Sequence, residues 1–143
     1  MYRRRNTLRE ITVTATFDQI KTVTDFVNDQ LAGLGCSERI RIQVDIAIDE
    51  LFGNIARYAY QPNIGPATVR VEVGEGPLSV IITFIDHGVP YNPLAARIPD
   101  TTSLPASERP IGGLGLFMVK KTMDDISYNY RDGQNILTIR KKL

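Results

Sequence analysis

Three short segments hold the residues whose types and spacing suit them best to chemistry. Residues 50–54 (Glu-Leu-Phe-Gly-Asn) place a carboxylate and an amide one helical turn apart. Residues 86–90 (Asp-His-Gly-Val-Pro) follow an apolar run, and residues 112–116 (Gly-Gly-Leu-Gly-Leu) begin another. In this order and at this spacing, the segments predict a nucleotide pocket with groups for a metal ion, a base and phosphates.

The first segment lies in a stretch with helical periodicity. At 100° per residue, Glu50, Asn54 and Arg57 fall within about 60° of one another beside the apolar stripe, so they would face a cleft. There a carboxylate can act as a general base, and an amide oxygen can ligate Mg²⁺. Ordinary charges at the boundary of a helix are the structural alternative, which this segment alone leaves open.

The second segment ends a strand. Residues 81–85 are almost continuously apolar, as in a central strand, and Asp86 follows them directly, which would set its carboxylate at a pocket floor. A carboxylate that accepts a hydrogen bond from an exocyclic amine selects adenine over guanine, and Gly88 would let the backbone approach the base. Asp-x-Gly is also common turn chemistry, so a plain strand end is the alternative.

The third segment begins a helix with glycines. Gly112, Gly113 and Gly115 stand where free N–H groups and the positive end of the helix dipole would bind phosphate. The Lys-Ser/Thr of a Walker motif is absent. A flexible hinge is the structural alternative, but the long polar loop that precedes the glycines favours phosphate binding.

The rest of the chain predicts the elements that must hold these segments. Alternation predicts a strand over residues 7–17, and helical spacing predicts one helix over 18–31, capped by Asp18, and another from Ser37 to about Tyr60. The other predicted elements are strands over 67–74 and 78–86, a helix over 114–123, and strands over 126–131 and 135–141. This order predicts an α+β fold, a two-layer sandwich whose mixed, mostly antiparallel sheet carries helices on one face.

Composition bounds the class of protein. The chain has 143 residues, 43% hydrophobic and 23% charged, and a formal net charge of +1. This fits a single domain and gives no general argument for nucleic acid or a membrane surface. Cys36 and His87 are the single cysteine and histidine, so the chain lacks an internal disulfide and the usual ligands of structural zinc. Without a signal-like start or a long apolar run, we expect a cytoplasmic protein.

Jointly, the three segments resemble the N, G1 and G2 boxes of the GHKL superfamily of ATP-binding domains. In detail, the chain resembles the small bacterial anti-sigma factor serine/threonine kinases. Residues 50–60 are similar to their N box, commonly E-x-x-x-N-x-x-K-H-A-Y, residues 85–93 to their G1 region, and residues 112–116 with the terminal hairpin to their G2 box and last strands. Tyr58 stands where His is common. No helix with a phosphoacceptor histidine precedes the domain, which argues against a complete two-component sensor kinase.

The resemblance implies the histidine-kinase-like ATPase (Bergerat) fold, with one ATP-binding kinase-like domain over residues 1–143 and an ATP lid over about 88–111. It implies Glu50 as the catalytic carboxylate and Asn54 as the Mg²⁺ ligand. Asp86 would accept from the adenine amino group, with Gly88 against the base. The other implied cofactor-binding residues are Arg57, Arg109, Gly113, Leu114, Gly115, Leu116 and Asn135. The glycine segment would act through backbone N–H groups, and Asn135 falls near a family Thr that helps to hold the adenine-site water.

The implied function is an ATP-binding anti-sigma factor that is also a serine/threonine protein kinase. With ATP and Mg²⁺ it would phosphorylate an antagonist protein, the anti-anti-sigma factor, and it would sequester a sigma factor. The alternative is an ATP-dependent partner-switching module without kinase activity. A homodimer is implied too, with the Thr-rich first strand as a candidate exposed edge. No direct nucleic-acid or membrane partner is expected.

Overall fold

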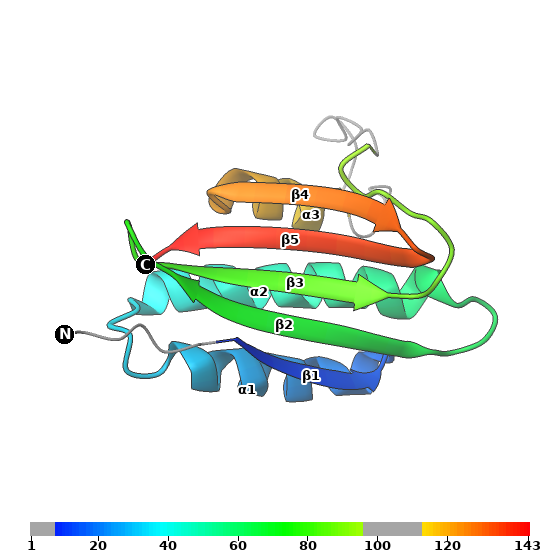
Figure 1. Cartoon of the computed structure of the whole chain (residues 1–143), viewed down its shortest axis with the longest axis horizontal. Coiled ribbons are helices and arrows are strands. Elements are labelled where there is room, and N and C mark those ends of the chain that lie inside the picture. Colours follow the sequence, from blue (N-terminus) through cyan, green and yellow to red (C-terminus); the bar gives the residue numbers. More distant parts are fainter. Residues whose placement is uncertain (1–7, 96–112) are drawn as a thin grey trace, which may run out of the picture.

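A computed structural model describes residues 8–95 and 113–143, and in these ranges five strands form one sheet in the order β1-β2-β3-β5-β4 (Figure 1). The strands are β1 (Arg9–Thr14), β2 (Pro66–Gly74), β3 (Ser79–Asp86), β4 (Asp125–Arg131) and β5 (Gln134–Lys142). Every neighbouring pair is antiparallel. Within the described residues the sheet contains no parallel pair, so it is antiparallel throughout and not mixed as the sequence predicted, because each strand pairs with a neighbour that runs the opposite way. The two predicted hairpins, β2–β3 and β4–β5, are both present.

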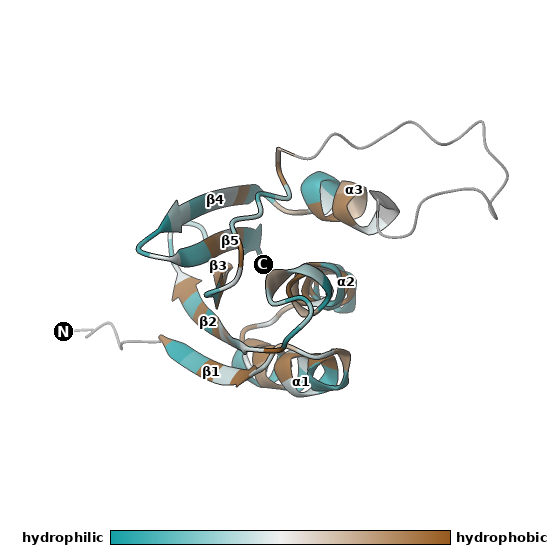
Figure 2. Cartoon of the chain, turned by 90° about the vertical axis from the view of Figure 1, so that its right-hand side faces the viewer, coloured by the Kyte–Doolittle hydropathy of each residue, from teal (hydrophilic) through white to brown (hydrophobic). Residues whose placement is uncertain are grey.

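The helices form a second layer on one face of this sheet (Figure 2). The main helices are α1 (Ile20–Leu31), α2 (Glu38–Asn54) and α3 (Gly113–Thr122). A short 3₁₀ turn, η1 (Phe17–Gln19), leads into α1, and a π-helical turn, η2 (Ile55–Ala59), continues α2. The predicted two-layer α+β sandwich is therefore confirmed. None of the helices in the described ranges has the length and apolar character needed to cross a membrane.

A side-chain cap begins α2 but not α1. The Ser37 hydroxyl accepts a hydrogen bond from the backbone N–H of Ile40 at 3.2 Å, so this residue caps α2 as predicted. The prediction that Asp18 caps the first helix is wrong. The chain enters α1 through η1, whose N-cap is the extended residue Thr16, so Asp18 already lies within the 3₁₀ turn.

The core between the two layers fixes where α2 and β3 end. Phe52 and Ile48 of α2 and Phe84 and Ile82 of β3 are almost wholly removed from water. Burial of such side chains is the main favourable contribution to folding, so it sets the relative position of the two elements. The carboxyl ends of α2 and β3 consequently lie at the same end of the molecule (Figure 1).

The position of each strand in the sheet matches its pattern. β3 lies in the centre, between β2 and β5, and its side chains are buried along nearly its whole length. The Thr-rich β1 lies at one edge, where Thr12 and Thr68 share a hydrogen bond of 2.8 Å across the β1–β2 pair. The expectation of an edge strand at the start of the chain is thus confirmed.

We expect Ser37→Ala to lower the free energy of unfolding by about 1 kcal/mol, because one N–H group of the first turn of α2 loses its partner. Ser37→Gly is the matched control, since glycine lets water reach the same N–H group and should cost only a few tenths of that amount. Urea denaturation of the three proteins measures the difference. Equal stability of wild type and Ser37→Ala would contradict the assigned cap.

Candidate functional site

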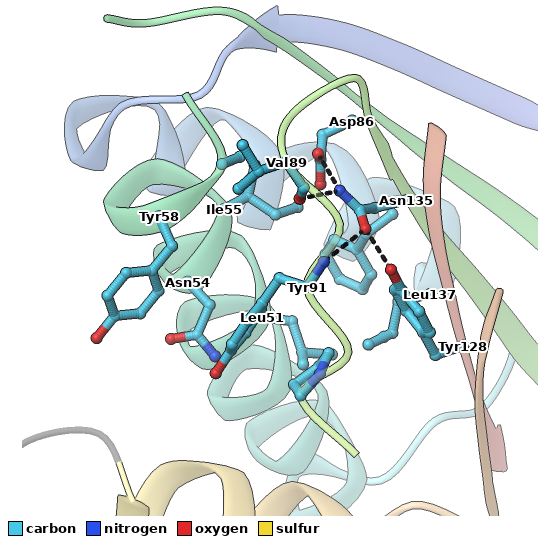
Figure 3. A pocket seen from close by; sticks show the side chains of 13 residues that line it. Leu51, Asn54, Ile55, Tyr58, Asp86, Val89, Tyr91, Tyr128, Asn135 and Leu137 are labelled. Atoms are coloured by element: carbon cyan, nitrogen blue, oxygen red, sulfur yellow. Dashed lines mark hydrogen bonds between the residues drawn. The ribbon is translucent and has the colours of Figure 1, made fainter. Parts of the chain in front are cut away.

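A pocket opens where the end of α2 and η2, the end of β3, and the β4–β5 hairpin meet (Figure 3). Its outer wall is residues 89–93, which follow β3 and which we call the strap. The lining residues are Leu51, Asn54, Ile55, Tyr58, Ala59, Phe84, Asp86, Val89, Tyr91, Pro93, Tyr128, Asn135 and Leu137. The lining is mostly apolar, with a few polar groups at defined places, as is typical of sites for small ligands.

Among the described residues that line the pocket, Asp86 is the one acidic residue, and it is 4% exposed. Its Oδ1 atom accepts hydrogen bonds from the Gly88 N–H group at 2.8 Å and from the Asn135 side-chain amide at 2.9 Å. Within the described part of the chain, no side chain or backbone group donates to Oδ2. This oxygen is therefore the acceptor that remains for a donor entering the pocket.

Asn135 connects this carboxylate to three other parts of the chain. Its Nδ2 atom donates both to Asp86 and to the Val89 carbonyl at 2.9 Å, and its Oδ1 atom accepts from the Tyr91 N–H group at 3.1 Å. The Tyr128 hydroxyl donates to the same Oδ1 atom. Figure 3 shows the four bonds meeting at one amide.

Of the aromatic lining, the sequence prediction singled out Tyr58, in place of the usual His, but not Tyr91 or Tyr128. The rings of Tyr58 and Tyr91 have centroids 5.7 Å apart and planes tilted by 41°, and both rings lie beside Asn54 (Figure 3). Helical spacing could have identified the wall on α2 and η2, because Leu51, Ile55 and Tyr58 recur on the face that carries Asn54. Tyr91 and Tyr128 have no such signal, since tertiary contacts alone bring them together.

Glu50 lies beside the pocket and not among the residues that line it. A Cβ atom on Gly115 would overlap the Glu50 carboxyl group, so this glycine allows the first turn of α3 to rest on α2 at Glu50. Asn54 follows one turn later on α2 and does line the pocket. The structure thus brings the predicted carboxylate, the predicted amide and the start of α3 together.

The environment of Glu50 favours its neutral form. Burial raises the pKa of Glu50 and the neighbouring Asp49 carboxylate adds to the rise, while the Arg57 guanidinium and a hydrogen bond with Asn54 act against it. A carboxyl group with a raised pKa is a better proton acceptor when it is ionised, which suits a general base.

Gly88 has a packing role that the sequence did not reveal. A Cβ atom there would overlap the carbonyl oxygen of Ala59, and the neighbouring Val89 N–H group donates to that oxygen at 3.0 Å. The turn after β3 is therefore docked on η2 through backbone contact. The expected contact between Gly88 and a base stays a prediction.

The remaining predicted residues fall in three groups. Arg57 is absent from the lining, and its guanidinium lies 5.5 Å from the Phe17 ring centroid and 5.8 Å from that of Tyr58. The segment 113–116 forms the first turn of α3, and of its described side chains Gly115 and Leu116 are not among the lining residues. Arg109 and Gly112 lie outside the described residues, as does the expected lid beyond residue 95.

No group of three or more His, Cys, Asp or Glu side chains suited to a metal ion occurs in residues 8–95 and 113–143.

Comparison with known proteins matches residues 13–141 to the family of histidine kinase-like ATPase domains. The chain is 31% identical over 103 residues to the serine/threonine-protein kinase BtrW of Bordetella bronchiseptica, covering 72% of this chain and 71% of that protein. It is 32% identical over 95 residues to the serine-protein kinase RsbW of Bacillus mycoides, covering 64% of this chain but only 58% of that protein.

Among solved structures, the RsbU and RsbW domains of a Mycobacterium tuberculosis protein match 95% of this chain with a TM-score of 0.65. The sequences are 18% identical, and the match spans 32% of that larger chain, so this likeness concerns the fold alone.

We expect Glu50→Gln to raise the melting temperature at pH 7 in the absence of nucleotide. Because the pKa of Glu50 is raised in the folded state, ionisation of this group costs stability as the pH rises through that pKa. Below the ordinary Glu pKa of about 4.3 the group is neutral in both states, and the two proteins should melt alike.

Melting curves between pH 4 and 7 measure this difference. Glu72→Gln, on the solvent side of β2, removes the same charge and should give no comparable pH-dependent gain. If Glu50→Gln melts lower than the wild type at pH 7, the assigned environment of Glu50 is wrong.

Proposed function

The chain belongs to the family of histidine kinase-like ATPase domains, and from this premise we propose that it binds ATP with Mg²⁺ in the pocket of Figure 3. The observation that carries the proposal is the buried carboxylate of Asp86, which keeps one acceptor oxygen for a ligand at the floor of an otherwise apolar pocket. We further propose that residues 1–143 form one ATP-binding domain whose lid spans about 88–111.

The Asp86 carboxylate fits a 6-amino purine. Its Oδ2 atom would accept from the exocyclic amine of adenine, whereas the keto oxygen of guanine or hypoxanthine would face it as a second acceptor. Apolar side chains of Leu51, Ile55 and Phe84 would cover the faces of the base. Strength of binding and choice of base would thus come from different groups of the same pocket.

The phosphates would extend from this pocket toward Asn54 and the first turn of α3. The N–H groups at the start of α3 and the positive end of its dipole suit phosphate oxygens. Asn54 would hold Mg²⁺ through its amide oxygen, together with those oxygens, and this donor set fits a hard cation that keeps few protein ligands. A bound Mg²⁺ would supply charge neutralisation on the transferring phosphoryl group.

Glu50 would orient a serine or threonine hydroxyl and accept its proton. It is one helical turn from Asn54 and touches the start of α3, so a hydroxyl held there would stand near the terminal phosphate. The raised pKa of Glu50 supports this role. Phosphoryl transfer needs chiefly alignment and charge stabilisation, which these three elements would provide.

At the level of the protein, we propose a serine/threonine kinase that phosphorylates an antagonist protein and sequesters a sigma factor, acting as a cytoplasmic homodimer. The support is the names of its relatives, which are serine and serine/threonine protein kinases. Because this chain spans 58% of the RsbW relatives and about a third of the M. tuberculosis chain, activity, dimer and partners remain proposals.

A second function has one observation in its favour. Glu50 packs against Gly115 instead of lining the pocket, so the site could bind ATP without presenting this carboxylate to a substrate hydroxyl. The chain would then be a module that exchanges partners according to its nucleotide state.

We expect Asp86→Asn to lose most of its ATP affinity and to shift its preference toward inosine triphosphate. The Asn carbonyl would take over the bonds from Gly88 and Asn135, which would leave an N–H donor where Oδ2 stood. That donor opposes the amine of adenine and suits the keto oxygen of hypoxanthine. Calorimetric titration with both nucleotides measures the change.

Asp132→Asn is the matched control for this test, because Asn tolerates the positive φ of 55° in the β4–β5 turn. It should bind ATP as the wild type does. Unchanged ATP affinity in Asp86→Asn would refute the assignment of the base site.

We expect Glu50→Gln to bind ATP but to transfer phosphate about 10² to 10⁴ times more slowly, because the general base is lost while the shape is kept. Incubation with labelled ATP and a candidate antagonist protein measures transfer. Glu38→Gln, which removes an exposed carboxylate at the start of the same helix, should keep the wild-type rate. Absence of transfer in the wild type, together with ATP-dependent partner binding, would favour the second function.

A further inference from the structure

One buried amide joins segments that lie far apart in the sequence. Asn135 of β5 is 6% exposed and hydrogen-bonds to the end of β3 at Asp86, to the strap at Val89 and Tyr91, and to β4 at Tyr128. The bonds to Asp86, Val89 and Tyr91 are 2.9 to 3.1 Å long, the range of well-formed N–H···O bonds.

The orientation of this amide is determined by its backbone partners. The Val89 carbonyl can only accept, and the Tyr91 N–H group can only donate, so the nitrogen must face Val89 and Asp86 and the oxygen must face Tyr91. Two N–H groups and two oxygen lone pairs are then all used. Asn135 consequently has no free group for a ligand, although it lines the pocket.

The strap depends on this amide for its attachment to the sheet. Among the described residues, Asn135 makes two hydrogen bonds to the strap, and the Tyr91 N–H group also lies against the Tyr128 hydroxyl of β4. The Val89 N–H group donates to Ala59 of η2, and the Asn92 bonds stay local, to Leu94 and Ala95. Removal of the amide would leave the Val89 carbonyl without its donor and would take one of two acceptors from the Tyr91 N–H group.

The same amide restricts the Asp86 carboxylate. Asn135 and the Gly88 N–H group both donate to Oδ1, which fixes the rotation of the carboxylate and leaves Oδ2 directed to a ligand. The Asn135 side chain thus both orients the Oδ2 atom of Asp86 and holds the strap in place.

We propose that Asn135 is a positioning residue that sets Asp86 and the strap as one unit before nucleotide arrives, and so determines selectivity for a 6-amino purine. The proposal rests on the function proposed above, because it assumes that Asp86 reads the base. A preformed site binds more tightly, since little ordering remains to be done on binding. Loss of the amide should therefore lower affinity for ATP and discrimination between bases together.

The experiment compares four full-length proteins by two measurements. The proteins are the wild type, Asn135→Ala, Asn135→Asp and Tyr128→Phe. The first measurement is hydrogen exchange of the Tyr91 backbone amide in nucleotide-free protein, and the second is the ratio of the dissociation constants of ATP and inosine triphosphate. A purely structural role would change the affinity for both nucleotides alike and leave their ratio unaltered.

For Asn135→Ala we expect the Tyr91 backbone amide to exchange about tenfold faster than in the wild type, or more. We also expect ATP binding about 10 to 100 times weaker, with a ratio that approaches one. Tyr128→Phe removes the hydroxyl from Asn135 and from the Tyr91 N–H group but keeps the bonds of Asn135 to Asp86, Val89 and Tyr91, so both quantities should stay within about threefold of the wild type.

Asn135→Asp keeps the shape and the bond from Tyr91, but an ionised carboxylate there can donate neither to Asp86 nor to the Val89 carbonyl, and it repels the Asp86 carboxylate. We therefore expect slow exchange at Tyr91 together with lost selectivity, and this variant keeps the test decisive if Asn135→Ala does not fold.

Unchanged exchange and an unchanged ratio in Asn135→Ala would overturn the proposal. An equally large loss of selectivity in Tyr128→Phe would also overturn it, because the bonds of Asn135 to Asp86 and Val89 would then not be the cause of selectivity. If the wild type binds neither nucleotide, the proposed function fails in the wild-type titration itself, and the role of Asn135 toward a base fails with it. Exchange at Tyr91 would still report separately whether the amide holds the strap.

Discussion

The cost of burying a carboxylate governs the arrangement of this site. Asp86 ends the central strand at a point where almost no water reaches it, and an ionised group in that position must be hydrogen-bonded to be tolerated. Two donors bind the Oδ1 atom of Asp86. One is the Gly88 N–H group, in the turn that packs on η2, and the other is the Asn135 amide, which also binds the strap. The second oxygen is left for a ligand, so satisfying the buried charge also shapes the pocket.

Close backbone contacts between the layers complete the site. Gly88 allows the turn after β3 to touch Ala59, and Gly115 allows α3 to touch Glu50. The sequence predicts that a nucleotide approaches the backbone at both glycines. In the folded chain each glycine is also a close contact between two elements of the protein, and a side chain at either position would push those elements apart.

Membership of the histidine kinase-like ATPase family and the geometry of the pocket address different questions. The family match covers nearly the whole chain and accounts for the two-layer architecture. The pocket adds contacts that the family match does not describe, among them the tyrosine pair at 5.7 Å and the fully bonded Asn135. Selectivity for a base and the rate of phosphoryl transfer depend on contacts of this kind, and the fold of the family does not determine them.

The sequence by itself determined the elements, their order and the two-layer class, because periodicity and turn residues act over a few neighbouring positions. It also placed Asn54 and Asp86 at one pocket, and it identified the Ser37 cap from local chemistry. Its error at Asp18 arose because a 3₁₀ turn, invisible to periodicity, precedes α1. Tertiary structure alone decided that Tyr91, Tyr128 and Asn135 meet, that Glu50 rests on Gly115, and that Arg57 turns to Phe17. These contacts join positions up to 65 residues apart, as for Glu50 and Gly115, and such pairings follow from packing of the whole core and leave no trace in local spacing.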